Sequence, residues 1–163
     1  MAGRISRRQL GRAVATRLVG VTNATGYFGQ IGALNGLPGV TGTPKSPPTK
    51  SADDLRVTPY FIVEPGVGGR RDETDLCDSF IDLDYPVTIR AAAGDVEDLL
   101  ALVDRIDGLL NRWSPGVLDG PDGPVLTGRM GTPPGYDPPV LPDTGVTPPR
   151  QYVPLQYVLP AHT

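Results

Sequence analysis

Residues 80–113 constrain the fold most, because the hydrophobic period there changes from two to about 3.6 within a few residues. In residues 81–91 every odd-numbered position is apolar and nearly every even-numbered one is polar, which predicts a half-buried β-strand. After Gly94 the apolar residues recur at spacings of three and four, which predicts an amphipathic helix. Its expected apolar face consists of Val96, Leu99, Leu100, Val103, Ile106, Leu110 and Trp113.

Residues at both ends of this helix support its assignment. Asp95 fits the N-cap position, and Asp98 follows three residues later, as in an acidic capping box. Glu97 adds a negative charge at the positive end of the helix dipole. Ser114 and Pro115 are expected to end the helix.

A second helix is expected near the N-terminus, from its N-cap Ser6 to about Val19. Leu10, Ala13, Val14, Arg17 and Leu18 would line one of its sides. Further strands are predicted at residues 26–31, 60–63 and 151–159. Residues 67–79 would form a hairpin connection into the strand at 81–91.

Gly and Pro together make 40 of the 163 residues, against a usual combined frequency of about 12%. They concentrate in two segments, about 32–58 and 114–150, which are expected to form long loops or arms. In the second segment, the turn pairs at 119–120 and 122–123 predict a small hairpin with Val125 and Leu126 on one side. Pro86 and Pro154 lack an N–H donor, so each is expected at a strand edge, a bulge or an outward-pointing site.

These elements predict a single α+β domain over residues 1–163. Its small antiparallel or mixed sheet would pack against the N-terminal helix and the long amphipathic helix. No run of about 18 apolar residues is present, so no membrane span is expected. The single cysteine, Cys77, is consistent with a reducing compartment.

Charge is distributed unevenly along the chain. Residues 1–52 carry seven basic side chains and no acidic one, whereas residues 53–163 carry eight basic and eighteen acidic ones. This polarity favours contact with a polyanion or head-to-tail association of copies. It is equally consistent with a basic helix that lies across the acidic part of its own subunit.

Residues for catalysis or metal binding are scarce. The only histidine, His162, is one residue from the end of the given sequence, where residues are usually mobile, so we expect no catalytic triad that uses it. Asp82 and Asp84 share a strand face, with Asp72, Glu73, Asp75 and Asp78 just upstream, but their spacing matches no EF-hand. We therefore expect no enzymatic activity, no cofactor and no specific metal site.

Five segments resemble the tail terminator proteins of long-tailed phages that infect actinobacteria. They are RISRRQLGR at 4–12, NATGYFG at 23–29, DLRVTPY at 54–60, AAGDVEDLLALVD at 92–104 and YVPLQY at 152–157. The resemblance implies an α+β virion protein that forms a ring, typically a hexamer, at the head-proximal end of the tail tube. Such a ring stops polymerisation of the tube and provides the surface that joins the head connector.

The resemblance also implies the partners: other copies of the chain, the tail tube protein, the connector or stopper protein, and DNA that passes through the ring. The protein would reside in the virion at the head–tail junction, and in the host cytoplasm during assembly. Arg4, Arg7, Arg8 and Arg12 are the expected assembly interface, and Asp82 and Asp84 are expected to face an acidic channel that repels the DNA backbone.

Two other functions fit the sequence. Another head-to-tail joining protein, a stopper or adaptor, would also form a ring. A small nucleic-acid-binding protein would use the arginines of the first helix on phosphates, although no second helix follows to form a helix-turn-helix.

Overall fold

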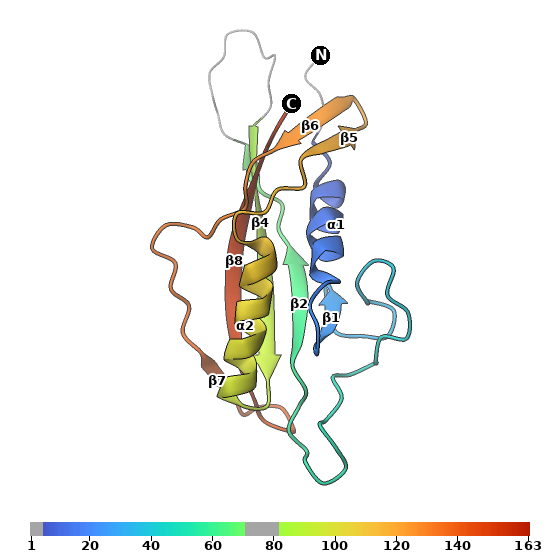
Figure 1. Cartoon of the computed structure of the whole chain (residues 1–163), viewed down its shortest axis with the longest axis vertical. Coiled ribbons are helices and arrows are strands. Elements are labelled where there is room, and N and C mark those ends of the chain that lie inside the picture. The colour runs from blue at the N-terminus through green and yellow to red at the C-terminus, as the bar shows by residue number, and fades with distance from the viewer. Residues whose placement is uncertain (1–4, 71–81) are drawn as a thin grey trace.

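The computed structural model describes residues 5–70 and 82–163 (Figure 1). The described residues form two helices and one eight-stranded mixed sheet, which confirms the α+β class. In chain order the elements are α1 Arg7–Leu18, β1 Thr25–Phe28, β2 Tyr60–Pro65, β3 Gly69–Arg70, β4 Asp82–Ala93, α2 Val96–Leu110, β5 Val117–Gly120, β6 Gly123–Thr127, β7 Leu141–Asp143 and β8 Arg150–His162.

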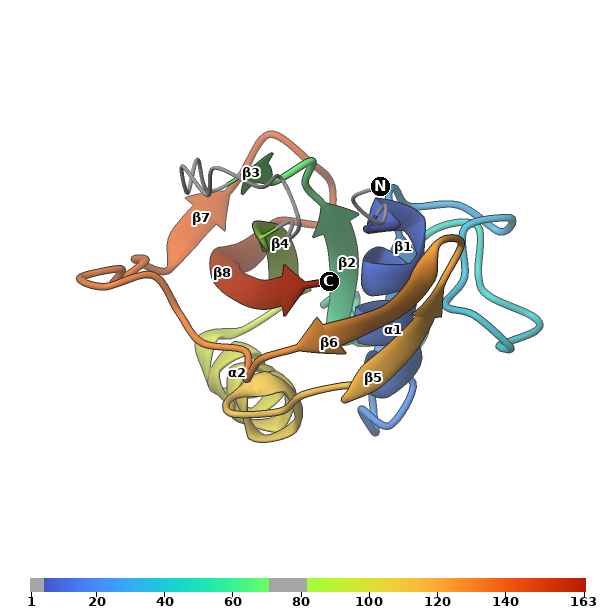
Figure 2. The same ribbon diagram turned by 90° about the horizontal axis from the view of Figure 1, so that it is seen from above.

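The sheet has the strand order β1-β2-β4-β8-β6-β5, with β3 paired to β4 and β7 paired to β8. β1 runs parallel to β2, and the other pairings are antiparallel. The sheet curls rather than lying flat, as the view along its strands shows (Figure 2). Its longest ladder joins β4 to β8, from Asp82 opposite His162 to Ala93 opposite Gln151.

The alternation predicted for residues 81–91 is confirmed in β4. Leu83, Tyr85, Val87, Ile89 and Ala91 are all buried, whereas the side chains between them are half-buried or exposed. The buried face belongs to the main hydrophobic core, which also includes residues of α1, α2 and β8. Both helices lie on this inner face of the sheet (Figure 1).

The helix predicted after Gly94 forms, but its buried face differs from the predicted one. Leu99, Leu102, Ile106 and Leu110 are buried. Val96 and Leu100, which the spacing placed on the core face, are 44% and 50% exposed. The buried face of α2 is therefore rotated toward Leu102 relative to the prediction. The apolar residues at 99, 102, 106 and 110 also have helical spacing, so the sequence is compatible with this second face.

This helix also ends earlier than predicted. α2 stops at Leu110, and Arg112 takes a φ of +61°, which is incompatible with a continuing helix. Trp113 therefore lies beyond the helix, with its backbone N–H donating to the Leu110 carbonyl at 3.1 Å. It is half-buried and packs against the core from the following segment.

The N-terminal helix begins where the sequence predicts. The Ser6 hydroxyl accepts a hydrogen bond from the Gln9 backbone N–H, which confirms Ser6 as the N-cap. Its buried residues are Leu10, Gly11, Val14, Ala15 and Leu18. Arg17, expected on the packing side, is exposed instead.

The remaining strands differ from prediction mainly in length. β1 occupies residues 25–28 rather than 26–31, and β8 is longer than the predicted 151–159. The hairpin expected from the two Asp-Gly pairs is confirmed: β5 and β6 pair antiparallel, with Gly120 opposite Gly123. The expected connection at 67–79 falls largely outside the described residues.

Pro86 and Pro154 both lie on inner strands of the sheet, β4 and β8. Pro86 is opposite Val158 and has an exposed side chain, so the outward-pointing alternative applies to it. Pro154 is opposite Arg90, and its carbonyl accepts a hydrogen bond from the Tyr136 hydroxyl. The backbone of Pro154 therefore faces the edge of β8 that lies away from β4. Along this edge β7 pairs with residues 150–152 and β6 with residues 161–162, so the missing N–H of Pro154 breaks no described strand pairing.

Candidate functional site

The arginines singled out from the sequence gather on the first half of α1. Arg7, Arg8 and Arg12 are all exposed, and the Nε of Arg7 donates to the Val67 carbonyl, which ties the helix to the segment after β2. Arg4 lies outside the described residues. Three cations are therefore presented together on two turns of helix.

These arginines border a cavity of about 470 Å³ between α1 and the end of β2. Its lining includes Arg7, Arg8 and Arg12 together with Phe28, Pro65 and Tyr85. We call this cavity the cationic pocket. It combines guanidinium groups with aromatic and proline surfaces, a lining suited to a ligand that is both anionic and apolar.

Close packing of α1 on the sheet shapes the inner wall of the cationic pocket. A Cβ atom at Gly11 would lie 2.7 Å from the Tyr85 hydroxyl and 3.4 Å from Pro65 Cβ, so the absence of a side chain permits this approach. Burial raises the pKa of Tyr85 to about 12, while the positive charge of Arg7 acts in the opposite direction. The phenol is thus neutral at physiological pH and adds no negative charge to the pocket.

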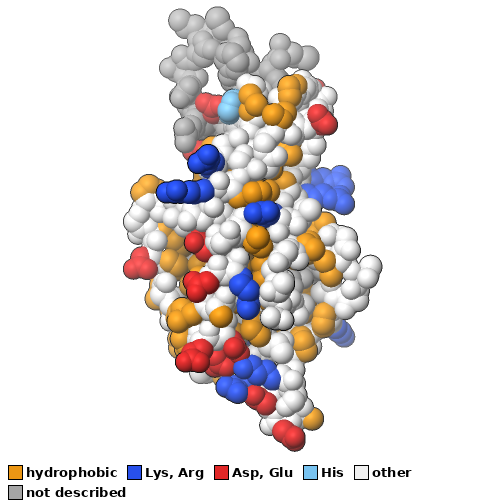
Figure 3. Space-filling model, in the orientation of Figure 1, with side chains coloured by type: hydrophobic (Ala, Val, Ile, Leu, Met, Phe, Trp, Pro, Cys, Tyr) orange, Lys and Arg blue, Asp and Glu red, His pale blue; other side chains and the backbone are white. Residues whose placement is uncertain are grey.

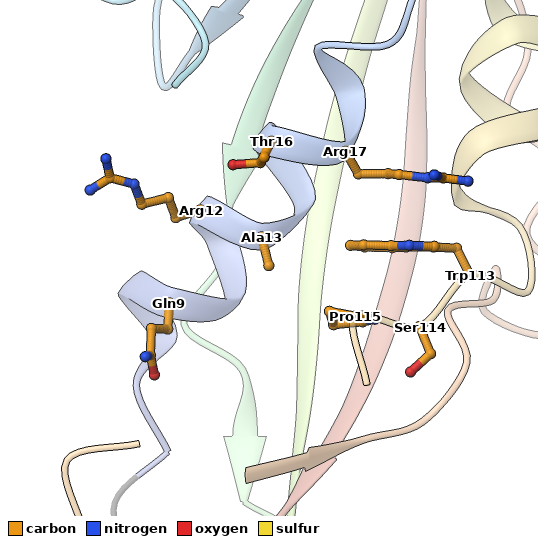
Figure 4. Close-up of a pocket in the computed structure, with 8 residues that line it drawn as sticks. All are labelled: Gln9, Arg12, Ala13, Thr16, Arg17, Trp113, Ser114 and Pro115. Atoms are coloured by element: carbon orange, nitrogen blue, oxygen red, sulfur yellow. The ribbon is translucent and has the colours of Figure 1, made fainter. Parts of the chain in front are cut away.

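A second cavity, of about 640 Å³, also has Arg12 in its lining (Figure 4). The Arg17 guanidinium lies over the Trp113 ring, 5.6 Å from its centroid, and the Arg17 Nε donates to the Leu109 carbonyl at 3.0 Å. The side chain of Arg12 points away from Trp113 (Figure 4). Arg17 therefore links α1 to α2 through the Leu109 carbonyl and to the segment after α2 through the cation–π contact, whereas Arg12 is exposed to solvent.

Asp82 and Asp84 lie at the start of β4, on the face of the sheet opposite the helices. Asp82 is opposite His162 and Asp84 is opposite Pro160 in β8, and both aspartates are half-buried. The upstream acidic residues 72, 73, 75 and 78 lie outside the described residues. Within residues 5–70 and 82–163, no three His, Cys, Asp or Glu side chains gather so as to hold a metal ion.

A compact turn before β2 was not anticipated from the sequence. Residues 50–56, which we call the knob, lie within a narrow loop closed by a bridge between Thr49 and Val57. The Ser51 N–H donates to the Asp54 carbonyl at 3.1 Å, and the Asp54 N–H donates to the Ser51 hydroxyl at 2.9 Å. Leu55 on this turn is 63% exposed.

Ion pairs tie the knob to the first turn of α2. Lys50 Nζ and Arg56 Nη1 lie 3.1 and 3.2 Å from the same Asp95 oxygen, and Lys50 also pairs with Asp98. A hydrogen bond from the Arg56 side chain lowers the pKa of Asp54 to about 2. Charged side chains of both signs gather at this lower end of the molecule (Figure 3).

Asp95 connects helix capping with this ion-pair network. Its Oδ1 accepts the Asp98 N–H at 2.9 Å, so Asp95→Ala should lower the free energy of unfolding by about 1 kcal/mol through loss of the cap. Asp95→Asn retains a capping oxygen but not the charge, so its free energy of unfolding should fall by less than that of Asp95→Ala. Urea denaturation of both variants checks this order, and equal losses would contradict it.

The difference in stability between the wild type and Asp95→Asn should depend on pH. The Asp98 N–H and then Lys50 hold the pKa of Asp95 below its ordinary value of 3.8. The stability advantage of the wild type over Asp95→Asn should therefore be complete above about pH 4 and decline as the pH falls through the lowered pKa. An advantage that grows on acidification would have the wrong sign.

A third cavity, of about 620 Å³, lies on the outer face of the sheet near β7. Arg150 lies over the Tyr60 ring, 5.5 Å from its centroid, and its Nη1 donates to the Tyr60 hydroxyl at 2.9 Å. Nothing in the sequence linked these residues, which are 90 positions apart. Only the register of β2, β4 and β8 brings them together.

No family model matches this chain, and a search of curated proteins returns no match. No helix among the described residues is long and apolar enough to cross a membrane. The candidate functional surfaces are therefore three: the cationic pocket on α1, the ion-paired knob at the start of α2, and the two aspartates on the outer face of β4.

Proposed function

We propose that this protein is a structural virion component that assembles into a ring at the head-proximal end of a phage tail tube. There it ends polymerisation of the tube and joins the tail to the head connector. The observation that carries the proposal is the separation of charge on the folded subunit. The exposed cations Arg7, Arg8 and Arg12 lie on α1, whereas the carboxylates of the knob and of the first turn of α2 lie together elsewhere.

This separation favours head-to-tail association of identical copies. Among the residues that the structure describes, no salt bridge involves these three arginines, so the described carboxylates of the subunit do not neutralise the basic helix. Opposite charges at two separate ends of a subunit favour a heterologous contact, in which one end of a copy meets the other end of the next. Heterologous contacts produce rings when the rotation between copies closes.

Apolar side chains on the connecting segments offer additional contact surface. Leu34, in the segment between β1 and β2, is 98% exposed. Val117 and Leu126 face each other across the β5–β6 hairpin and are 59% and 44% exposed. The hairpin reaches across the end of α1 (Figure 2), where Gln9 donates to the Asp119 carbonyl. These Gly- and Pro-rich segments would act as arms between neighbouring subunits or toward the tube and connector proteins.

Asp82 and Asp84 would line the DNA channel of the ring. Both project from the outer face of β4, which the helices leave uncovered (Figure 1). Carboxylates along a channel repel the phosphate backbone and so let DNA pass without being held. A ring in which both residues map to the exterior would contradict this assignment.

The proposal is tested by reversing the charge of α1 in Arg7→Glu/Arg8→Glu/Arg12→Glu. We expect this variant to remain folded, because the three side chains are exposed, and to fail to form rings or to join tails to heads. Circular dichroism checks the fold, while light scattering coupled to gel filtration and electron microscopy of particles check assembly. Normal virions built from this variant would refute the assignment of these arginines to the assembly interface.

Localisation in intact particles separates the proposal from its alternatives. Labelled protein between tube and connector supports a tail terminator, whereas a position within the connector itself indicates a stopper or adaptor. A monomer that binds DNA strongly, with steep salt dependence, would indicate instead a nucleic-acid-binding protein that uses the arginines of α1.

A further inference from the structure

We propose that the knob of one copy docks into the cationic pocket of the next copy. The inference rests on the proposed self-association and names the two surfaces that meet. It is carried by three features of the described residues: the lining of the pocket, the charge and exposed leucine of the knob, and the hydrogen bonds that fix the shape of the knob.

The cationic pocket selects an occupant with both a carboxylate and an apolar side chain. Three arginines line it, and none of the described salt bridges neutralises them. Phe28, Pro65 and Tyr85 supply apolar and aromatic surface in the same cavity. Its volume of about 470 Å³ lies within the range of pockets that hold small molecules, a size that suits the side chains at the tip of a loop.

The knob presents this combination. Leu55 is 63% exposed, and the neighbouring Asp53 is exposed as well. Together the knob and the first turn of α2 contain five carboxylates and two cations, a balance of −3, which matches the three arginines of the pocket. The five carboxylates are Asp53, Asp54, Asp95, Glu97 and Asp98, and the two cations are Lys50 and Arg56.

The knob is held in shape before it meets a partner. Its turn is closed by the reciprocal bonds between Ser51 and Asp54, and the Lys50 N–H donates to the Arg56 carbonyl at 2.9 Å. The Asp54 carboxylate is engaged by Arg56 at 2.8 Å. Because the turn is already ordered, docking costs little conformational entropy, which favours affinity.

A knob and its own pocket are separated by the body of the subunit. The knob adjoins the start of α2 at the lower end in Figure 1, whereas the first turn of α1 lies toward the opposite end. Each copy therefore offers its knob to one neighbour and its pocket to another. Such a contact is heterologous and propagates from copy to copy.

Cysteine cross-linking tests the contact directly. In a background where the single native cysteine is replaced (Cys77→Ser), we introduce Arg12→Cys in one preparation and Asp53→Cys in another. Under mild oxidation the mixture should give a covalent dimer, and the double variant should give a ladder of multimers. No cross-link in the mixture, or equal cross-linking in each preparation alone, would overturn the proposal.

Charge reversal provides a second test that does not depend on a covalent bond. Arg8→Glu/Arg12→Glu and Asp53→Arg should each weaken self-association about tenfold or more in sedimentation experiments. Mixing the two variants should restore assembly, because the reversed pocket of one meets the reversed knob of the other. Asp104→Arg, the same charge change at an exposed site in the middle of α2, is the matched control and should leave association unchanged.

The outcomes distinguish this inference from the proposed function. If the wild type forms rings but neither reversal affects them, the docking contact is wrong and the ring stands. If the wild type stays monomeric at all concentrations and is absent from particles, both fail. Restored assembly in the mixture, with association unchanged in Asp104→Arg, supports both.

Discussion

Replacing Leu102 by alanine should lower the free energy of unfolding by about 2–5 kcal/mol. The Leu102 side chain is 0% exposed and lies on the buried face of α2, in the main core. Its truncation removes apolar burial and leaves a cavity that the surrounding strands fill only in part. Urea or guanidinium denaturation followed by circular dichroism measures the loss.

Leu100→Ala is the matched control, since it makes the same chemical change two residues earlier. Leu100 is 50% exposed, so its loss should change the free energy of unfolding by no more than about 1 kcal/mol. The two variants also test which face of α2 is buried, because the hydrophobic pattern alone placed Leu100 on the core face, whereas the structure places Leu102 there. Equal losses for both variants would contradict the packing described for α2.

The second large effect is expected at Gly94, between β4 and α2. A Cβ atom there would lie 2.7 Å from Arg56 Cβ and 2.8 and 3.0 Å from the backbone N and O of Val57. The Gly94 N–H also donates to the Val57 carbonyl at 3.0 Å, which fixes the two segments against each other. Gly94→Ala should therefore lower the free energy of unfolding by about 1–3 kcal/mol through overpacking against backbone.

Gly108→Ala provides a control of opposite sign. Gly108 lies within α2, and a Cβ there would meet nothing within 4 Å. Alanine should raise the free energy of unfolding by about 0.5–1 kcal/mol, because glycine is a poor helix former. Thermal and chemical denaturation of the two variants should shift in opposite directions, and a loss at both positions would refute the steric explanation for Gly94.

Local patterns predicted much of the secondary structure. The alternation in residues 81–91, the N-caps Ser6 and Asp95 and the hairpin turn pairs each rest on interactions within a few residues, and the structure confirms them. The buried face of α2 was predicted less well. Leu100 and Leu102 are both apolar and both fit a helical spacing, so only the neighbours of the helix decide which one is buried.

Trp113, just after α2, is a second residue whose position the local sequence pattern did not predict. Its spacing from Leu110 is helical, yet the chain leaves the helix before it and brings the indole beneath Arg17 of α1. A cation–π contact between residues 96 positions apart leaves no periodic trace in the sequence. Pro154 in β8 is comparable, since only the positions at which β6 and β7 pair with β8 show that its backbone nitrogen needs no strand partner.

For the candidate surfaces too, some features follow from the sequence and others only from the tertiary structure. The sequence by itself determined that basic residues precede acidic ones, that Ser6 starts a helix carrying Arg7, Arg8 and Arg12, and that Asp82 and Asp84 share a strand face. Charge order and strand or helix periodicity are properties of neighbouring residues. The tertiary structure alone decided that these arginines border a cavity with Phe28, Pro65 and Tyr85, and that Lys50 and Arg56 fix the knob on Asp95. These groups meet because the strand register and the packing of two helices on one curled sheet close contacts between distant segments, and no local pattern encodes that closure.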